Sequence, residues 1–142
     1  MFQHAPSLPG TLRLSVAICT WNRCNSLRQT LEGFTGLAVP AATDWEILVV
    51  NNNCTDQTDQ VIQAYEDRLP VRRAFEPRPG LSHARNRAIA EATGDYILWT
   101  DDDVTVSPNW LVSYVRCIQA LARCRSVRWS NTALAGAPHL DR

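Results

Sequence analysis

Three consecutive aspartates, Asp101, Asp102 and Asp103, end an apolar run in the segment YILWTDDDVTVSP, residues 96–108. Adjacent carboxylates repel one another and prefer water, so this cluster is not expected inside a hydrophobic core. A divalent cation such as Mg²⁺ or Mn²⁺ would offset the repulsion, because these ions prefer oxygen ligands and often take one or two carboxylates plus substrate phosphates. The alternative is a solvated acidic turn at the start of the next helix, where carboxylates are favourable.

Two further polar clusters follow apolar runs in the same way. TWNR, residues 20–23, follows the run 14–19, and NNNCTD, residues 51–56, follows the run 45–50. Near-continuous apolar runs of this length are typical of strands that are buried on both faces of a parallel sheet. In an open parallel sheet, ligands bind outside the carboxyl ends of the strands. We therefore expect the three polar clusters to converge on one edge of the sheet.

The elements that must position these clusters alternate along the chain. Strands are predicted over 14–19, 45–50, 71–75 and 95–100, and helices over 25–34, from 58 or 59, over 81–94 with Gly94 as its stop, and from Pro108. Asn25 or Ser26 is expected to cap the first helix and Ser107 the last, because such side chains accept hydrogen bonds from unpaired helix amides. This alternation predicts an α/β fold with a mainly parallel sheet, helices on both faces and right-handed crossovers.

Composition excludes several classes of protein. The 142 residues suffice for one domain, and a formal net charge of zero gives no global attraction to nucleic acid or anionic lipid. No apolar run approaches the roughly 20 residues of a membrane span, and the N-terminus lacks a secretory pattern. All fourteen basic residues are arginines, which excludes chemistry that needs a lysine amine. The five cysteines form no C-x-x-C pair, so free thiols are expected rather than disulfides or a zinc site.

Three ordered segments resemble the nucleotide-binding half of a family 2 glycosyltransferase with the GT-A fold. They are LSVAICTWNR, WEILVVNNNCTDQT and PGLSHARNRAIAEATGDYILWTDDDV, and the resemblance covers about residues 12–116. It implies a Rossmann-like GT-A fold that is incomplete at the C-terminus. It also implies transfer of a sugar from a nucleoside-diphosphate sugar, with UDP or GDP as the nucleotide, to an acceptor hydroxyl by a metal-assisted inverting mechanism. Mg²⁺ or Mn²⁺ would be the cofactor.

The resemblance also assigns residues to the site. The nucleotide-sugar-binding residues would be Thr20, Asn22, Arg23, Asn51, Asn52, Asp56, Arg85, Asp101 and Asp102, and the metal ligands Asp103 and Asp101. Asn51 stands where the family commonly holds the base through a carboxylate, and its amide both donates and accepts where a carboxylate only accepts. Arg85, in the segment ARN, is a candidate partner for the diphosphate, because a guanidinium can bind two oxygens at once. The alternative for Arg85 is a solvent-facing helix residue.

Two neighbouring residues have open interpretations. Trp21 either stacks near the nucleotide base or has a packing role. Cys19, inside the first strand, is expected to be a small core residue. The acceptor would be a glycan or a lipid-linked molecule of unknown identity. The predicted location is cytoplasmic, with a peripheral position at the inner face of the membrane as the alternative.

The segment after the aspartates departs from the family pattern. An inverting transfer needs a general base for the acceptor hydroxyl, and after Asp103 the only acidic residue is Asp141. No catalytic residue is therefore assigned, and the acceptor half is expected to be absent. Residues 1–116 carry ten arginines and thirteen acids, a balance of −3, whereas 117–142 carry four arginines and one aspartate, a balance of +3. We interpret 1–11 as a flexible lead-in and 117–142 as an atypical tail, either an ordinary basic tail or a non-native continuation.

Two alternative functions remain at this point. The chain could be a non-catalytic remnant that binds a sugar nucleotide and transfers nothing. It could also be a haloacid dehalogenase-type phosphohydrolase, with Asp101 as nucleophile and Asp103 as acid/base in a D-x-D-x-T signature ending at Thr105. That signature normally opens its domain and is followed by a lysine, whereas here it begins at residue 101 and the chain has no lysine.

Overall fold

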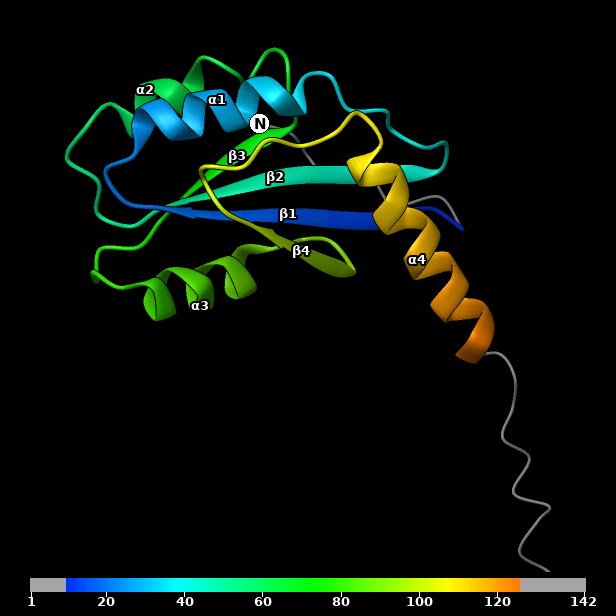
Figure 1. Cartoon of the computed structure of the whole chain (residues 1–142). Helices are drawn as coiled ribbons and strands as arrows, with labels where there is room; N and C mark the ends of the chain where they lie inside the picture. Colours follow the sequence, from blue (N-terminus) through cyan, green and yellow to red (C-terminus); the bar gives the residue numbers. More distant parts are fainter. Residues whose placement is uncertain (1–9, 126–142) are drawn as a thin grey trace, which may run out of the picture.

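The structure, a computed structural model, describes residues 10–125 (Figure 1). It contains β1 (Leu12–Thr20), α1 (Cys24–Phe34), β2 (Thr43–Asn51), α2 (Thr58–Gln63), β3 (Val71–Phe75), α3 (Leu81–Glu91), β4 (Tyr96–Thr100) and α4 (Trp110–Arg125). The predicted alternation of strands and helices is confirmed. Residues 1–9 of the predicted flexible lead-in and residues 126–142 of the predicted atypical tail lie outside the described residues, so these parts of the two predictions are not tested. The first nine residues of the predicted tail, 117–125, complete α4.

The sheet has four parallel strands in the order β3-β2-β1-β4. Its two middle strands are buried, and Val16, Ala17 and Ile18 of β1 are fully inaccessible to solvent. The chain moves from β1 outward to β2 and β3, and then crosses to β4 on the other side of β1. This reversal creates a topological switch point between β1 and β4, where α/β folds of this kind form their ligand crevice.

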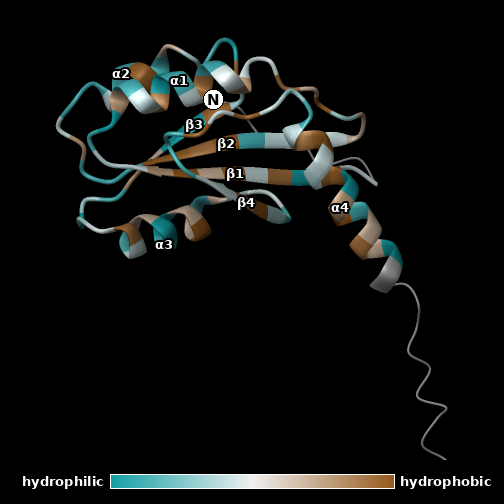
Figure 2. Cartoon of the chain, viewed as in Figure 1, coloured by the Kyte–Doolittle hydropathy of each residue, from teal (hydrophilic) through white to brown (hydrophobic). Residues whose placement is uncertain are grey.

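Helices cover both faces of the sheet, as predicted (Figure 1). On one face α1, α2 and α4 pack on the strands through a large apolar cluster that includes Leu27, Phe34, Ile62 and Leu111. On the other face α3 packs through small residues such as Ala84. The connections through α1 and α2 lead across the sheet from β1 to β3, whereas the connection through α3 leads back from β3 to β4. If all three connections are right-handed, the helix of the returning connection must lie on the opposite face of the sheet. Figure 2 shows hydrophobic and hydrophilic residues alternating around these helices, as expected for helices with one face on a sheet.

Several predicted helix ends are wrong. Neither Asn25 nor Ser26 caps α1, because the helix starts at Cys24 and makes no side-chain cap from its own first residues. α3 ends at Glu91, so Gly94 does not stop it. A Cβ on Gly94 would lie 2.5 Å from the backbone nitrogen of Ser15, so glycine is needed there for close approach to β1.

The start of α4 and the inner face of α3 also differ from expectation. α4 begins at Trp110 rather than Pro108, and Ser107 contributes its backbone carbonyl, which accepts the Trp110 amide at 3.0 Å, instead of a side-chain cap. In the sequence pattern Leu81 shares one helical face with Ala84, which predicts that both are buried, but Leu81 is 55% exposed because it opens the helix at the rim of the sheet.

The two edge strands differ in charge. β3 carries Arg72 and Arg73, which form ion pairs with Glu46, Glu91 and Asp59. β4, with the sequence YILWT, has no charged residue, and its Tyr96 and Trp99 are 44% and 41% exposed. Charged side chains on an edge strand discourage pairing with another chain. The β3 edge therefore has this protection and the β4 edge does not.

Candidate functional site

The three polar clusters predicted from the sequence meet at the carboxyl edge of the sheet. Thr20 and Asn51 are register partners at the ends of β1 and β2, and Thr100, at the end of β4, is the register partner of Ile18. Asp101 therefore follows directly beside the end of β1. The expected convergence on one edge is confirmed, and it lies at the switch point of the fold.

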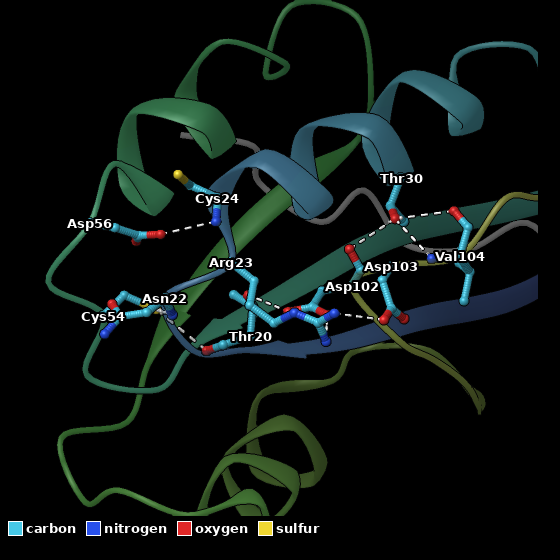
Figure 3. A network of polar contacts seen from close by, with 10 residues as sticks. All are labelled: Thr20, Asn22, Arg23, Cys24, Thr30, Cys54, Asp56, Asp102, Asp103 and Val104. Carbon is cyan, nitrogen blue, oxygen red and sulfur yellow. Dashed lines mark hydrogen bonds and ion pairs between the residues drawn. The ribbon is translucent and has the colours of Figure 1, made fainter.

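Asp102 is the buried member of the aspartate cluster, with only 4% of its surface exposed. Its carboxylate accepts a hydrogen bond from the Thr20 hydroxyl at 2.7 Å and pairs with Arg23 Nη1 at 3.0 Å (Figure 3). Its backbone carbonyl accepts the Thr30 hydroxyl at 3.0 Å, and the same hydroxyl bonds to Val104. Asp102 thus joins the ends of β1 and β4 to α1. A carboxylate can follow an apolar strand here because the Thr20 hydroxyl and the Arg23 guanidinium bind it.

Asp103 and Asp101 are exposed to solvent. The Asp103 carboxylate accepts a hydrogen bond from Arg23 Nη2 at 2.7 Å, and the side chains of Asp103 and Arg23 are 48% and 50% exposed. The hydrogen bond to Asp103, followed by the charge of Asp102, raises the pKa of Arg23. Within residues 10–125, Asp101 has no hydrogen bond or ion pair, so its carboxylate is open to a ligand.

The two asparagines after β2 use their amide groups within the protein. Asn51 donates to Asp59 at 2.7 Å and accepts from the Cys54 amide at 2.7 Å. Asn52 donates to the carbonyls of Glu76 and Arg78 at 3.1 and 2.7 Å, and it accepts from the Gly80 amide at 2.9 Å. Both side chains are almost fully buried. They shape the rim, and a nucleotide contact through either amide would have to share it with these bonds.

Asn22 and Asp56 join the loops after β1 and β2. Asp56 accepts hydrogen bonds from the Cys24 amide at 2.9 Å and from the Thr58 amide and hydroxyl at 3.1 and 2.6 Å, so one carboxylate caps both α1 and α2. Burial alone would raise the pKa of Asp56, but these hydrogen bonds outweigh it and lower the pKa. Asn22, in a left-handed conformation with φ 52°, accepts from the Thr55 amide at 2.7 Å.

A crevice opens between the ends of β1 and β4 and the start of α3. One hollow of about 300 Å³ is lined by Cys19, Thr20, Trp21, Asn52, Pro79, Gly80, Leu81 and Ala84. A second of about 240 Å³ is lined by Cys19, Leu81, Arg85, Trp99, Thr100 and Asp101. The two hollows share Cys19 and Leu81, so an elongated ligand could lie across both. The first is mainly apolar in its lining, whereas the second contains the charges of Arg85 and Asp101.

Arg85 and Trp21 both face this crevice rather than the core. The Arg85 guanidinium lies 5.8 Å from the centre of the Trp99 ring and forms no ion pair within the described part of the chain. It is therefore available for an anion. Trp21 is 63% exposed, so its packing interpretation is wrong and a stacking role remains.

Sequence reasoning missed two residues at this edge. Cys19 is half-buried and lines both hollows, so it is not simply a core residue, and burial raises the pKa of its thiol to about 11. Glu76, directly after β3, is almost fully buried and pairs with Arg78 at 2.9 Å and Arg87 at 3.4 Å. Hydrogen bonds from Arg78 lower the pKa of Glu76 to about 2. The signal for Glu76 was a carboxylate directly after a predicted strand, as at Asp101.

The aspartates fit a cation that a ligand's phosphates complete. Among residues 10–125, no group of three or more His, Cys, Asp or Glu side chains is placed to hold a metal. Asp101, which lines the charged end of the crevice, and Asp103, two residues later, are nevertheless exposed carboxylates, and Mg²⁺ commonly binds through one or two carboxylates plus phosphates. The described residues also contain no helix long and apolar enough to cross a membrane.

Comparison with known proteins identifies the family. The profile of glycosyl transferase family 2 matches residues 15–123. Succinoglycan biosynthesis protein ExoM of Rhizobium meliloti (strain 1021) is 28% identical over 103 residues, which are 71% of this chain and 33% of ExoM. The chain thus spans about a third of this curated relative.

Two solved structures resemble the fold at 25% identity. TarS of S. aureus, in complex with UDP-GlcNAc, superposes with a TM-score of 0.68 over 77% of this chain and 32% of TarS. The mannosyltransferase PcManGT of Pyrobaculum calidifontis, in complex with GDP-Man and Mn²⁺, superposes with a TM-score of 0.67 over 79% of this chain and 34% of PcManGT. The family match removes the haloacid dehalogenase alternative. This chain belongs to glycosyltransferase family 2 and has the N-terminal part of a GT-A fold.

Proposed function

We propose that this chain binds a nucleoside-diphosphate sugar, with Mg²⁺ or Mn²⁺, in the crevice at the switch point of the sheet. The observation that supports this most directly is the crevice itself, which places an exposed tryptophan at one end and Arg85 beside Asp101 at the other. An aromatic face and an apolar hollow suit a base, whereas a guanidinium and a cation held by carboxylates suit a diphosphate. UDP and GDP sugars, which are bound by TarS and PcManGT, are therefore the first donors to test.

Each exposed residue has a distinct role in this proposal. Trp21 stacks on the base, and Arg85 binds diphosphate oxygens with its two parallel donors. Asp103, assisted by Asp101, would hold the cation, which as a Lewis acid neutralises charge on the leaving diphosphate. Thr20 and Asp102 keep the turn after β4 in place, because Asp102 is buried and bonded to both β1 and α1.

The chain supplies the donor side of an inverting transfer in this proposal and does not complete the reaction alone. Residues 104–125 contain no Asp or Glu, so no carboxylate follows the aspartates within the described part of the chain to accept the proton of an acceptor hydroxyl. Binding without transfer is therefore the expected behaviour of the isolated chain. The acceptor, a glycan or a lipid-linked molecule, would be positioned by segments that the described residues do not include.

Calorimetric titration of UDP and GDP, each with and without Mn²⁺, tests the binding proposal. The cation should strengthen binding of at least one nucleotide in the parent chain, and Asp103→Ala should remove that gain. Asp44→Ala is the matched control, because Asp44 is an exposed aspartate at the amino end of β2, at the opposite end of the sheet. Equal Mn²⁺-dependent affinity in the parent and in Asp103→Ala would contradict the role given to Asp103.

Transfer is tested separately by incubating the chain with UDP-glucose or GDP-mannose and measuring free nucleotide diphosphate. Binding with no release of diphosphate supports a donor-binding portion. Turnover by the isolated chain would contradict the statement that it lacks a complete reaction centre, while leaving the binding proposal intact.

A further inference from the structure

Arg23 occupies an unusual place beside the aspartate cluster. Its two terminal nitrogens bind two different carboxylates, Nη1 to Asp102 at 3.0 Å and Nη2 to Asp103 at 2.7 Å (Figure 3). The positive charge of Arg23 therefore offsets the negative charge that a divalent cation would otherwise balance. Asp103 has no other hydrogen-bond or ion-pair partner within residues 10–125.

The two carboxylates differ in how firmly they are held. Asp102 is buried, and it is fixed by the Thr20 hydroxyl and through its carbonyl by Thr30. Asp103 is half-exposed and is held only by Arg23, whose side chain is itself half-exposed. Exposed ion pairs of this kind are weak, because water and salt screen them. Arg23 can therefore release Asp103 at small cost while it keeps its bond to Asp102.

We propose that Arg23 is an internal counter-ion that competes with the divalent cation for Asp103 and turns toward the diphosphate when cation and nucleotide bind together. This proposal rests on the proposed function of the crevice. Without nucleotide, a cation must displace Arg23 and leave its charge beside the metal, so binding is disfavoured. With nucleotide, the diphosphate supplies new anionic oxygens for the guanidinium, so both ligands gain. Cation and nucleotide should then bind with positive coupling, each raising the affinity of the other by the same factor.

A purely structural role for Arg23 makes the opposite prediction. If Arg23 only supported the turn after β4, its removal would loosen the aspartates and weaken cation binding. If Arg23 competes with the cation, its removal frees Asp103 and strengthens cation binding in the absence of nucleotide. The direction of the change therefore separates the two roles.

The experiment titrates Mn²⁺ alone into the full chain and follows free Mn²⁺ by electron paramagnetic resonance. Arg23→Gln removes the positive charge and keeps a shorter, polar side chain, and it should bind Mn²⁺ roughly three- to tenfold more tightly than the parent. Arg23→Lys retains a positive charge and should stay close to the parent. Arg28→Gln, which removes an exposed arginine of α1, the helix that follows Arg23, is the matched control and should leave Mn²⁺ affinity unchanged.

A second titration measures UDP and GDP with and without Mn²⁺ in the same variants. The factor by which Mn²⁺ raises nucleotide affinity should be smaller in Arg23→Gln than in the parent. Far-UV circular dichroism and thermal melting establish that each variant is folded, and Arg23→Ala replaces Arg23→Gln if the latter does not fold.

The outcomes separate this proposal from the function on which it rests. Mn²⁺ affinity in Arg23→Gln that is equal to or weaker than the parent overturns the counter-ion role, even where nucleotide binding depends on Mn²⁺. Absence of Mn²⁺ binding in every variant overturns it too. Tighter Mn²⁺ binding in Arg23→Gln with no nucleotide binding in any variant supports the competition for Asp103 and instead contradicts the proposed function.

Discussion

The two sides of the site rim use similar polar residues in different ways. On the β2 side, Asn51, Asn52 and Asp56 place their polar atoms in hydrogen bonds to neighbouring loops and helix ends. On the β4 side, Asp101 and Arg85 face the crevice without ion pairs among residues 10–125. Clusters that look alike in the sequence therefore have two functions. The β2 side builds the rim, whereas the β4 side, apart from the buried Asp102, presents groups that a ligand can use.

Among the substitutions that test this difference, Asn52→Leu should cause the largest loss of stability. Asn52→Leu keeps the approximate size of the side chain and removes three hydrogen bonds to the 76–80 loop. Two carbonyls and one amide would lose their partners beside a buried leucine, so we expect a loss of about 3 kcal/mol in the free energy of unfolding. Urea denaturation measures this loss. Asn25→Leu, at an exposed position of α1, is the control and should stay within about 0.5 kcal/mol.

Asp56→Ala should have the next largest effect, because this carboxylate caps two helices. Loss of a helix cap costs about 1–2 kcal/mol, and we expect a decrease of that size in the free energy of unfolding. Asp67→Ala removes an exposed aspartate that caps neither helix and serves as the control. If both variants unfold at the same urea concentration, Asp56 does not have the capping role that its hydrogen bonds indicate.

A pH titration sharpens the comparison at Glu76, on the β3 side of the rim. The pKa of Glu76 falls from an ordinary 4.5 to about 2 in the folded protein. A lowered pKa means that the charged carboxylate contributes stability above about pH 4.5, and that this contribution is lost as the pH falls toward 2. The difference in urea midpoint between the parent and Glu76→Gln should therefore be largest near neutral pH and shrink below pH 4. A constant difference from pH 7 to pH 3 would rule out this linkage.

The smallest effect on stability is expected on the β4 side. Asp103→Asn removes a charge whose ion pair is half-exposed, so the free energy of unfolding should change by less than about 0.5 kcal/mol. The same variant should lose Mn²⁺-dependent nucleotide affinity. A large loss of stability in Asp103→Asn would place Asp103 with the residues that build the rim.

The fold and the location of the site could be predicted because they depend on local patterns. The apolar runs that end at Cys19 and Val50 mark buried strands, and polar residues after such strands must lie at the carboxyl edge. The aspartate cluster after β4 was found by the same rule. The order and spacing of the apolar runs and polar clusters along the sequence were enough to predict the fold and the location of the site.

Which polar residues build the rim and which remain open to a ligand could not be predicted, because this depends on hydrogen-bond partners that are far away in the chain. Asn52 bonds to residues 24 to 28 positions later, and Asp56 caps α1 from 32 positions away. Local reasoning instead assigned that cap to Asn25 or Ser26, which are merely close in sequence. The need for Gly94 has the same origin, since it arises from the backbone of Ser15 and not from the helix before it.

Because β1 lies between β2 and β4 in the sheet, it cannot complete its pairing during synthesis until β4 has been made. β1 is made first, but its neighbour β4 is made last of the four strands, and Thr20 and Asp102, which share a hydrogen bond, are 82 residues apart. At about 5–20 residues per second, roughly 4–16 seconds of translation separate these two residues. During that interval the edge of β1 that will pair with β4 has no partner, and this strand is largely apolar, so the incomplete nascent chain should be a good client for ribosome-associated chaperones. Slow codons between β2 and β4 would prolong its exposure.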